Sequence, residues 1–412
     1  MNEAPRKGSL LVIFLTVFID LLGFGIVLPL LPIYGRQFPS IDQHGLMLGM
    51  LMASFSLMQF IFAPMWGRLS DNIGRRPVLM VGLAGSVVFY TLFAIATAQL
   101  NLVLLFVARI GAGISGATIS TAQAYIADST TLEKRPRGMA LIGMAFGLGF
   151  TVGPAIGYLA VPAGPDSPPG PLPGYVAAGL SLVALILAIF MLPESRSSSS
   201  QQNSHRKMFD WQGFKTALQT PSIGLLLFAV FVCVFSFANF ETTLSLLMKE
   251  NFKFSYQMVM GTFCYIGLTL SIVQGGIVRR LAGKVPESSL AATGAVLQVV
   301  GLILIYFAAT QESLALFWLA LTVMVAGFSL MQPSLSSLIS RRSDPETQGR
   351  ILGVSQSVNA MARIVGSAVG IPLFHMNYAF PYFFAAVLML VGVVLVVYAG
   401  KAGKDFVVPS KA

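Results

Sequence analysis

The sequence predicts an all-α integral membrane protein with twelve transmembrane helices in two six-helix pseudo-repeat bundles and both termini cytoplasmic. Charged residues make up only 10% of the chain and hydrophobic residues 55%. Soluble globular proteins carry about 25% charged residues. The apolar runs are each long enough for a helix to cross about 30 Å of hydrocarbon, which takes about 20 residues. They are continuous rather than alternating, which excludes a β-barrel.

The twelve expected spans follow one another with short polar bridges between them. They lie at residues 9–33, 46–66, 78–98, 100–126, 137–161, 174–192, 221–247, 255–278, 288–309, 313–340, 350–373 and 378–400.

The net charge of +10 indicates membrane topology rather than nucleic-acid binding. If the amino terminus is cytoplasmic, the outer bridges hold only Arg36, Lys249 and Lys253, and almost all other Lys and Arg residues lie on the cytoplasmic side. This is the positive-inside distribution. Neither of the 2 cysteines suggests a disulfide or metal site, and we expect no cofactor and no metal.

A serine-rich segment divides the chain into halves that look like copies of each other. We expect one bundle at residues 1–192, a linker at 193–220 and a second bundle at 221–412. The run that begins Arg68-Leu69 recurs at Arg280-Leu281, and Gly113 corresponds to Gly327 at nearly the same offset. Such agreement favours parallel six-helix repeats, which place a substrate site near the membrane midplane.

A densely charged bridge follows the second span. Its sequence is G-R-L-S-D-N-I-G-R-R-P, from Gly67 to Pro77, and it predicts a helix end at Gly67 and a restart at Pro77. It resembles the loop between helices 2 and 3 of the major facilitator superfamily. This resemblance implies a cytoplasmic gate, for which the candidate residues are Gly67, Asp71, Gly74, Arg75, Arg76 and Asp128. Surface ion pairs contribute little singly, so only a shielded network would hold the gate.

Asp20 lies in the middle of the first span. Inserting an aspartate there costs roughly 2.5–3.5 kcal/mol, so it requires a partner. Arg109 is the candidate partner, and it shares one helical face with Gly113, Gly116, Ser120 and Gln123. The face is either a close-packing seam with a structural ion pair or a proton-handling site. Arg109 and Gly113 resemble the fourth-helix motif of the superfamily's antiporters, in which the arginine is linked to proton handling.

The fifth span carries a glycine–proline pattern made by Gly149, Gly153, Pro154 and Gly157. It resembles the fifth-helix signature of exporters in the superfamily, although Tyr158 stands where the family has a second glycine. Glycines that permit close helix packing and a proline that bends the helix also explain the pattern.

The second half holds one further carboxylate well inside a span, Glu241. It either attracts a cationic substrate or carries a proton, or it lies near the outer mouth as a solvated residue. Asn239 lies about 200° away around the helix, so the two cannot face one cavity unless the helix is broken there. Further polar side chains form stripes that either bond helices together or line a cavity. The cavity-lining candidates are Gln123, Asn239, Gln332, Gln356, Asn359 and Arg363.

These features together resemble the twelve-span drug/proton antiporters, and most closely the tetracycline-exporter-like branch. The resemblance rests on the 67–77 bridge, Asp20 with the downstream Leu28–Pro32, Arg109, and Gly153-Pro154. It implies export of a lipophilic small molecule by alternating access, with Asp20, Arg109 and Glu241 as coupling residues. Tetracycline exporters carry acidic and histidine residues in spans eight and nine, and this chain has neither there, so tetracycline is not assigned as the substrate.

Other functions are weighed against this one. A symporter or uniporter of a metabolite, sugar or lipid is the alternative within transport, and a non-transporting receptor or scaffold is the alternative from another class. No nucleophile–base arrangement or phosphate loop suggests an enzyme. We expect a monomer in a lipid bilayer, the bacterial inner membrane, with protons and a small molecule as its partners and no nucleic acid.

Overall fold

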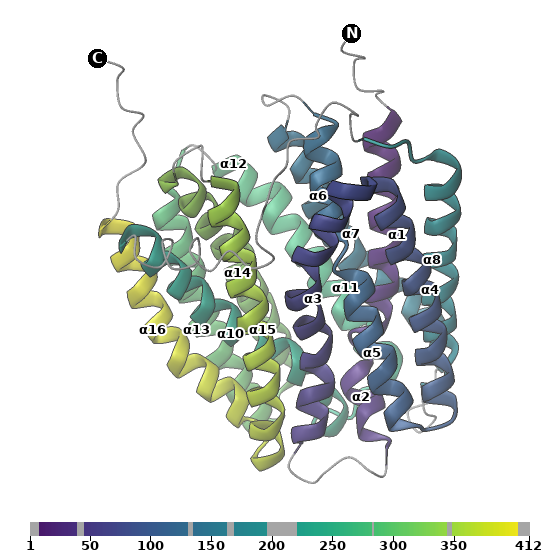
Figure 1. The fold of residues 1–412 in the computed structure, drawn as a ribbon. Helices are drawn as coiled ribbons and strands as arrows, with labels where there is room; N and C mark the ends of the chain where they lie inside the picture. The colour runs from purple at the N-terminus through teal and green to yellow at the C-terminus, as the bar shows by residue number, and fades with distance from the viewer. Residues whose placement is uncertain are drawn as a thin grey trace, which may run out of the picture. The chain divides into compact units, whose positions relative to one another are not determined.

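The computed structural model describes residues 8–38, 45–130, 135–162, 169–195, 221–281, 284–343 and 348–402, and all regular secondary structure within them is helical (Figure 1). In these ranges 12 helical segments are long and apolar enough to cross a membrane. The prediction of an all-α protein with twelve spans is therefore confirmed. Most of the predicted linker, from residue 196 to 220, lies outside the described residues.

Two of the first six spans are interrupted helices. Span one consists of α1 (Gly8–Val27) and α2 (Leu31–Arg36), and span four consists of α5 (Leu102–Gly116) and α6 (Ile119–Asp128). The other four spans are single helices: α3 (Leu46–Ile73), α4 (Arg75–Ala98), α7 (Arg135–Ala160) and α8 (Leu172–Met191). The break in span one falls at Pro29, and the break in span four falls at Ala117 and Thr118.

The last six spans contain one irregular helix. They are α10 (Pro221–Glu250), the eighth span made of α11 (Tyr256–Ile272), the π-helix η1 (Val273–Val278) and α12 (Arg279–Leu281), then α13 (Glu287–Gln311), α14 (Leu314–Arg342), α15 (Gln348–Met376) and α16 (Phe380–Ala402).

The described helices group into two compact units. Unit 1 contains α1, α2, α3 from Ser54 onward, α4 to α8, and α11 up to Gly267. Unit 2 contains α3 up to Ala53, α10, α11 from Leu268 onward with η1, and α12 to α16. Each unit therefore draws one helix segment from the opposite half of the sequence.

The expected helix end at Gly67 is wrong. The helix α3 continues through Gly67 to Ile73, and the chain turns only at Gly74, whose φ of +105° favours glycine. Helix α4 then starts at Arg75, ahead of Pro77. A glycine inside a helix costs only about 1 kcal/mol relative to alanine, so Gly67 weakens the helix without ending it. The left-handed backbone at Gly74 makes the turn.

Helix packing within unit 1 uses the glycines of α7. A Cβ added at Gly153 would lie 2.8 Å from the carbonyl oxygen of Leu22 in α1, and one added at Gly149 would lie 3.0 Å from Leu21 Cβ. From the other side, a Cβ at Gly25 would lie 2.6 Å from the carbonyl oxygen of Gly149. The two backbones therefore approach as closely as small residues allow, which is the usual means of association in membranes.

The next glycine of the signature packs on a different helix. The methyl group of Met260, in the unit 1 part of α11, occupies the space where a side chain at Gly157 would lie. Pro154 has no N–H, so it leaves the Phe150 carbonyl without its helical hydrogen bond. That carbonyl faces Gly267 of α11, where an added Cβ would lie 2.6 Å away. The signature of span five therefore builds two interfaces of unit 1.

The close α1–α7 contact generates a stability prediction. Replacing Gly153→Ala should destabilise unit 1 by about 1–3 kcal/mol, the usual cost of overpacking, because the new methyl would press on the Leu22 carbonyl. Gly143→Ala in the same helix is the matched control. No atom lies within 4 Å of a Cβ there, so helix propensity alone should leave stability equal or higher. Thermal unfolding of both purified variants measures the difference, and equal melting temperatures would contradict the packing account.

Candidate functional site

The carboxylate of Asp20 is held by hydroxyl groups. Ser181 of α8 donates a hydrogen bond from Oγ to Asp20 Oδ1 at 3.0 Å, and Ser86 of α4 is a second hydroxyl partner. Both serines are buried, whereas Asp20 is half-buried in α1. Three helices of unit 1 therefore converge on this carboxylate. The sequence analysis named Asp20 but not the two serines, because their spacing along the chain gives no sign that they meet it.

Arg109 of α5 is not paired with Asp20 in the described structure. Its guanidinium lies over the ring of Phe55 in α3, with Cζ 4.7 Å from the ring centroid. The side chain is only 3% exposed and its Nε has no hydrogen-bond partner. The buried Tyr90 of α4 lies close enough to interact electrostatically with both Asp20 and Arg109. The expected partnership is therefore absent from this conformation, and a cation–π contact takes its place.

The polar face that follows Arg109 packs mainly against α3. A Cβ at Gly113 would lie 2.6 Å from the Phe55 carbonyl. Gln59 donates from Nε2 to the Gly116 carbonyl at 3.3 Å, and Trp66 donates from Nε1 to the Ile114 carbonyl at 2.7 Å. These side chains satisfy carbonyls next to the break between α5 and α6. Gln123, further along in α6, is half-buried.

In unit 2 the structure brings together a coupling candidate and a cavity-lining candidate that lie far apart in sequence. Arg363 of α15 forms an ion pair through Nη1 with Glu241 of α10. Next to it, Gln332 of α14 donates from Nε2 to Asn359 Oδ1 at 3.2 Å. Glu241 is thus neither alone nor merely solvated. All four residues are candidates from the sequence, but neither pairing follows from it.

The remaining two candidates of unit 2 lie apart from this cluster. Asn239 is fully buried, and its Nδ2 bonds to the carbonyl of Phe235 in its own helix. A Cβ added at Gly370 of α15 would lie 2.7 Å from Asn239 Oδ1, so this side chain sits in a tight helix contact. Gln356 is exposed on α15. Because α10 is one continuous helix, Asn239 and Glu241 do point in different directions.

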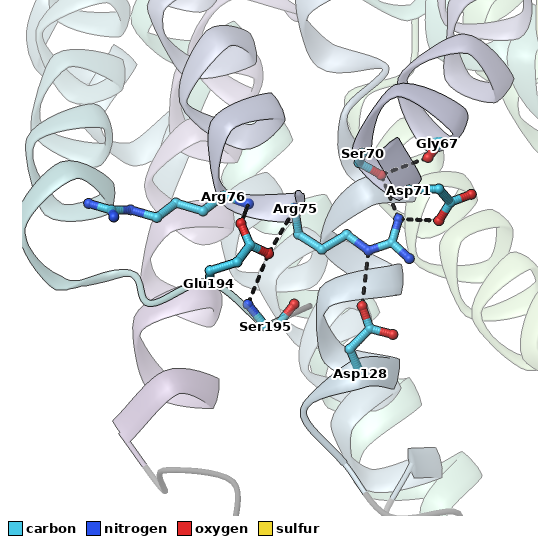
Figure 2. A network of polar contacts seen from close by, with 8 residues as sticks. All are labelled: Gly67, Ser70, Asp71, Arg75, Arg76, Asp128, Glu194 and Ser195. Carbon is cyan, nitrogen blue, oxygen red and sulfur yellow. Dashed lines mark hydrogen bonds and ion pairs between the residues drawn. The ribbon is translucent and has the colours of Figure 1, made fainter. Parts of the chain in front are cut away.

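The charged residues of the 67–77 bridge form a network centred on Arg75 (Figure 2). Arg75 Nη1 lies 2.6 Å from Asp71 Oδ1, and Arg75 Nε lies 3.0 Å from Asp128 Oδ2 at the end of α6. Arg75 Nη1 also donates to Ser70 Oγ at 2.6 Å, and Ser70 donates to the Gly67 carbonyl at 2.7 Å. One guanidinium therefore joins the end of α3, the start of α4 and the end of α6.

A second carboxylate, Glu194, binds the start of α4 from the chain that follows α8. Its oxygens accept hydrogen bonds from the backbone N–H groups of Arg75 at 2.9 Å and Arg76 at 3.1 Å (Figure 2). The side chain of Arg76 extends away from that of Arg75 and donates to the Ile189 carbonyl of α8 at 2.6 Å. Gly74 has no side chain with which to cap the helix, so Glu194 supplies the cap. Sequence reasoning missed this residue.

The corresponding place in unit 2 carries an ion pair of the opposite polarity. Glu287 is the first residue of α13, and Arg341 lies one residue before the end of α14. Arg341 Nη1 lies 2.7 Å from Glu287 Oε2. In unit 1 the arginine lies at the start of α4 and the aspartate at the end of α6. In unit 2 the glutamate lies at the start of α13 and the arginine near the end of α14, so the charges are exchanged.

The cap generates a second stability prediction. Glu194→Ala should destabilise unit 1 by about 1 kcal/mol, because loss of an N-cap acceptor typically costs 0.5–2 kcal/mol. Glu194→Gln keeps one acceptor oxygen and should lose less. Thermal unfolding of the two variants in the same detergent checks the order, and an alanine variant as stable as the parent chain would refute the capping role.

Comparison with known proteins gives the family. The model of the Major Facilitator Superfamily matches residues 13–367. Multidrug resistance protein 2 of Bacillus subtilis is 27% identical over 95% of this chain and 94% of its own length. Tetracycline resistance protein, class E, of Escherichia coli is 32% identical over 86% of this chain and 84% of its own length.

A solved structure agrees with these relatives. The human organic anion transporter MFSD10 (TETRAN) is 26% identical, with a TM-score of 0.73 over 96% of this chain and 100% of that chain. The predicted resemblance to the superfamily and its drug-efflux transporters is thereby confirmed, and these relatives are transporters rather than enzymes, as expected. Sequence, fold and relatives agree that the chain belongs to the Major Facilitator Superfamily of multi-pass membrane transporters.

Proposed function

We propose that this chain exports a lipophilic small molecule in exchange for protons, by alternating access, with Asp20 as the protonation site. The support from relatives is that one is named for tetracycline resistance and another for multidrug resistance. The support from the residues is a carboxylate in the middle of a span that three helices converge on. An ionisable group at that depth is costly unless it has a function or a fixed partner.

One observation carries the proposal. Arg109 is buried on an aromatic ring, while Asp20 contacts neutral hydroxyl groups. A fixed structural ion pair would bring the two charges together, because an unpaired buried charge is strongly unfavourable. Their separation favours a carboxylate that gains and loses a proton, with Arg109 as the group that can compensate its negative charge in another conformation. Tyr90 lies near both and suits a relay between them.

The proposed cycle follows from this chemistry. In the outward-open state a proton from outside neutralises Asp20, and the substrate leaves. Return to the inward-open state delivers the proton to the cytoplasm. The freed Asp20 carboxylate then permits new substrate to bind, and the substrate competes with Arg109 for this carboxylate.

The cytoplasmic gate is proposed to be the Arg75 network, which joins three helix ends of unit 1. It would hold the cytoplasmic side closed, as was expected of Gly67, Asp71, Gly74, Arg76 and Asp128.

The setting proposed with this function is a monomer in a bacterial inner membrane. Both termini would lie in the cytoplasm, and a cytoplasmic linker at 193–220 would join bundles at 1–192 and 221–412. The support is the basic charge, which lies almost entirely on one side of the expected topology.

The proposal predicts a specific loss in Asp20→Asn. Purified protein is reconstituted into liposomes with an imposed pH gradient, and uptake of fluorescent lipophilic compounds of negative, zero and positive charge is followed. The asparagine cannot release a proton, so accumulation driven by the gradient should disappear, while downhill exchange of the same compound should persist. Glu312→Gln, an exposed carboxylate outside the site, is the matched control and should accumulate normally.

Two results would contradict proton-coupled export. Parent-chain transport that ignores the pH gradient would favour a uniporter. Uphill export that survives Asp20→Asn would remove Asp20 from the coupling step, whatever compound is carried.

A further inference from the structure

The two members of the Glu241–Arg363 ion pair are unequally accessible. The Arg363 side chain is 38% exposed, whereas that of Glu241 is 11% exposed. Only one guanidinium nitrogen, Nη1, bonds to Glu241 among the described contacts. A guanidinium has five N–H donors in a planar fork, so most of them remain available. The reachable charge of this pair is therefore the positive one.

The surroundings of the pair are uncharged and partly aromatic. Asn359 precedes Arg363 by one turn of α15 and bonds to Gln332 of α14. One turn before Gln332 lies Phe328, and one turn before Glu241 lies Phe237. These two rings are stacked, with centroids 3.7 Å apart and planes 15° apart. Three helices of unit 2 thus meet through an ion pair, an amide pair and a ring pair at neighbouring turns.

This combination recognises a particular chemistry. An exposed guanidinium binds a carboxylate or sulfonate in two parallel hydrogen bonds, which are stronger than bonds between neutral groups. The Phe237 and Phe328 rings are buried against each other, so they stiffen the helix contact next to the ion pair and leave the guanidinium as the exposed binding group. No second carboxylate contacts Arg363 in the described part of unit 2, so no further negative charge there would attract a cation once Glu241 is engaged.

We propose that Arg363 is the substrate-binding group of unit 2 and that the substrate class is an organic anion. Glu241 is the internal counter-ion that the anion displaces. It keeps the guanidinium compensated while the site is empty, since an unpaired charge among these helices would be costly. This inference rests on the proposed transport of a small molecule and adds the charge of that molecule. It stands against one of the alternatives given above for Glu241, the attraction of a cationic substrate.

The test exploits the opposite roles of the two partners. Purified protein in detergent is titrated with three fluorescent probes that share one ring system: pyrenebutyrate, its neutral amide, and pyrenebutylammonium. Arg363→Gln should weaken pyrenebutyrate binding about tenfold or more, the scale of a lost charge-assisted contact, and leave the amide unchanged. Glu241→Gln should strengthen pyrenebutyrate binding, because the competitor for Arg363 is gone.

Matched controls separate this effect from general damage. Arg341→Gln removes another arginine of unit 2 that pairs with a glutamate, and it should leave all three affinities unchanged. The double variant Glu241→Gln/Arg363→Gln has no charge left at the site and should bind the anion and the amide alike. If a single variant does not yield a monodisperse protein, the double variant still reports whether charge discrimination resides at this pair.

Each alternative result overturns the proposal. Loss of pyrenebutylammonium binding in Glu241→Gln, with a gain in Arg363→Gln, would identify a cation site. Equal weakening of all probes in both single variants would mean a structural ion pair. Absence of any preference for the anion in the parent chain would remove the substrate class. Binding is measured without a proton gradient, so a failure of proton-coupled export would leave the anion-binding result intact. Likewise, a failure of anion binding would leave the transport result intact.

Discussion

The cost of placing charge inside a hydrophobic layer is the constraint on which the rest of this structure depends. Each midspan charge requires its own form of compensation. Asp20 has hydroxyl groups, Arg109 has an aromatic ring, and Glu241 and Arg363 have each other. The first two solutions are easily exchanged for others, because neither a hydroxyl nor a ring neutralises a full charge. The third is a true ion pair, which only another ion can replace without loss.

Close helix packing depends on glycines in both units. In unit 1 the glycines of span five allow α7 to approach α1, and in unit 2 the glycines of span eleven do the same for α10. A Cβ at Gly366 would lie 2.8 Å from Ala238 Cβ, just as one at Gly153 would lie 2.8 Å from the Leu22 carbonyl. Spans one and seven, like spans five and eleven, occupy corresponding positions in the two halves. The repeat predicted from weak sequence matches is therefore visible as equivalent packing. In each seam one of the two helices carries a buried or half-buried carboxylate, Asp20 in α1 and Glu241 in α10.

The sequence predicted the twelve spans because a segment of about 20 residues can cross the bilayer when it is apolar enough, and that depends only on the residues of the segment itself. It named Asp20, Arg109, Glu241 and Arg363 for the same reason, since each is an exception to that hydropathy. The sequence did not predict which of these side chains contact each other. The pairing of Glu241 with Arg363 joins residues 122 apart, and the hydroxyl partner Ser181 is 161 residues from Asp20. Glu194 was missed because an exposed glutamate after a span looks like ordinary surface. The end of α3 was misplaced because glycine composition alone does not tell which glycine adopts a positive φ.

The exchanged polarity of the ion pairs Arg75–Asp128 and Arg341–Glu287 has an electrostatic consequence. A helix start is partially positive and a helix end partially negative, an effect of about 0.3–1 kcal/mol per well-placed charge. Glu287 and Arg341 agree with these partial charges, whereas Arg75 and Asp128 oppose them. The first half therefore relies on Glu194 for the negative charge that its helix start lacks. Added salt screens both halves alike, yet only the first half contains a mismatch that the screening relieves, so ionic strength acts unequally on the two halves.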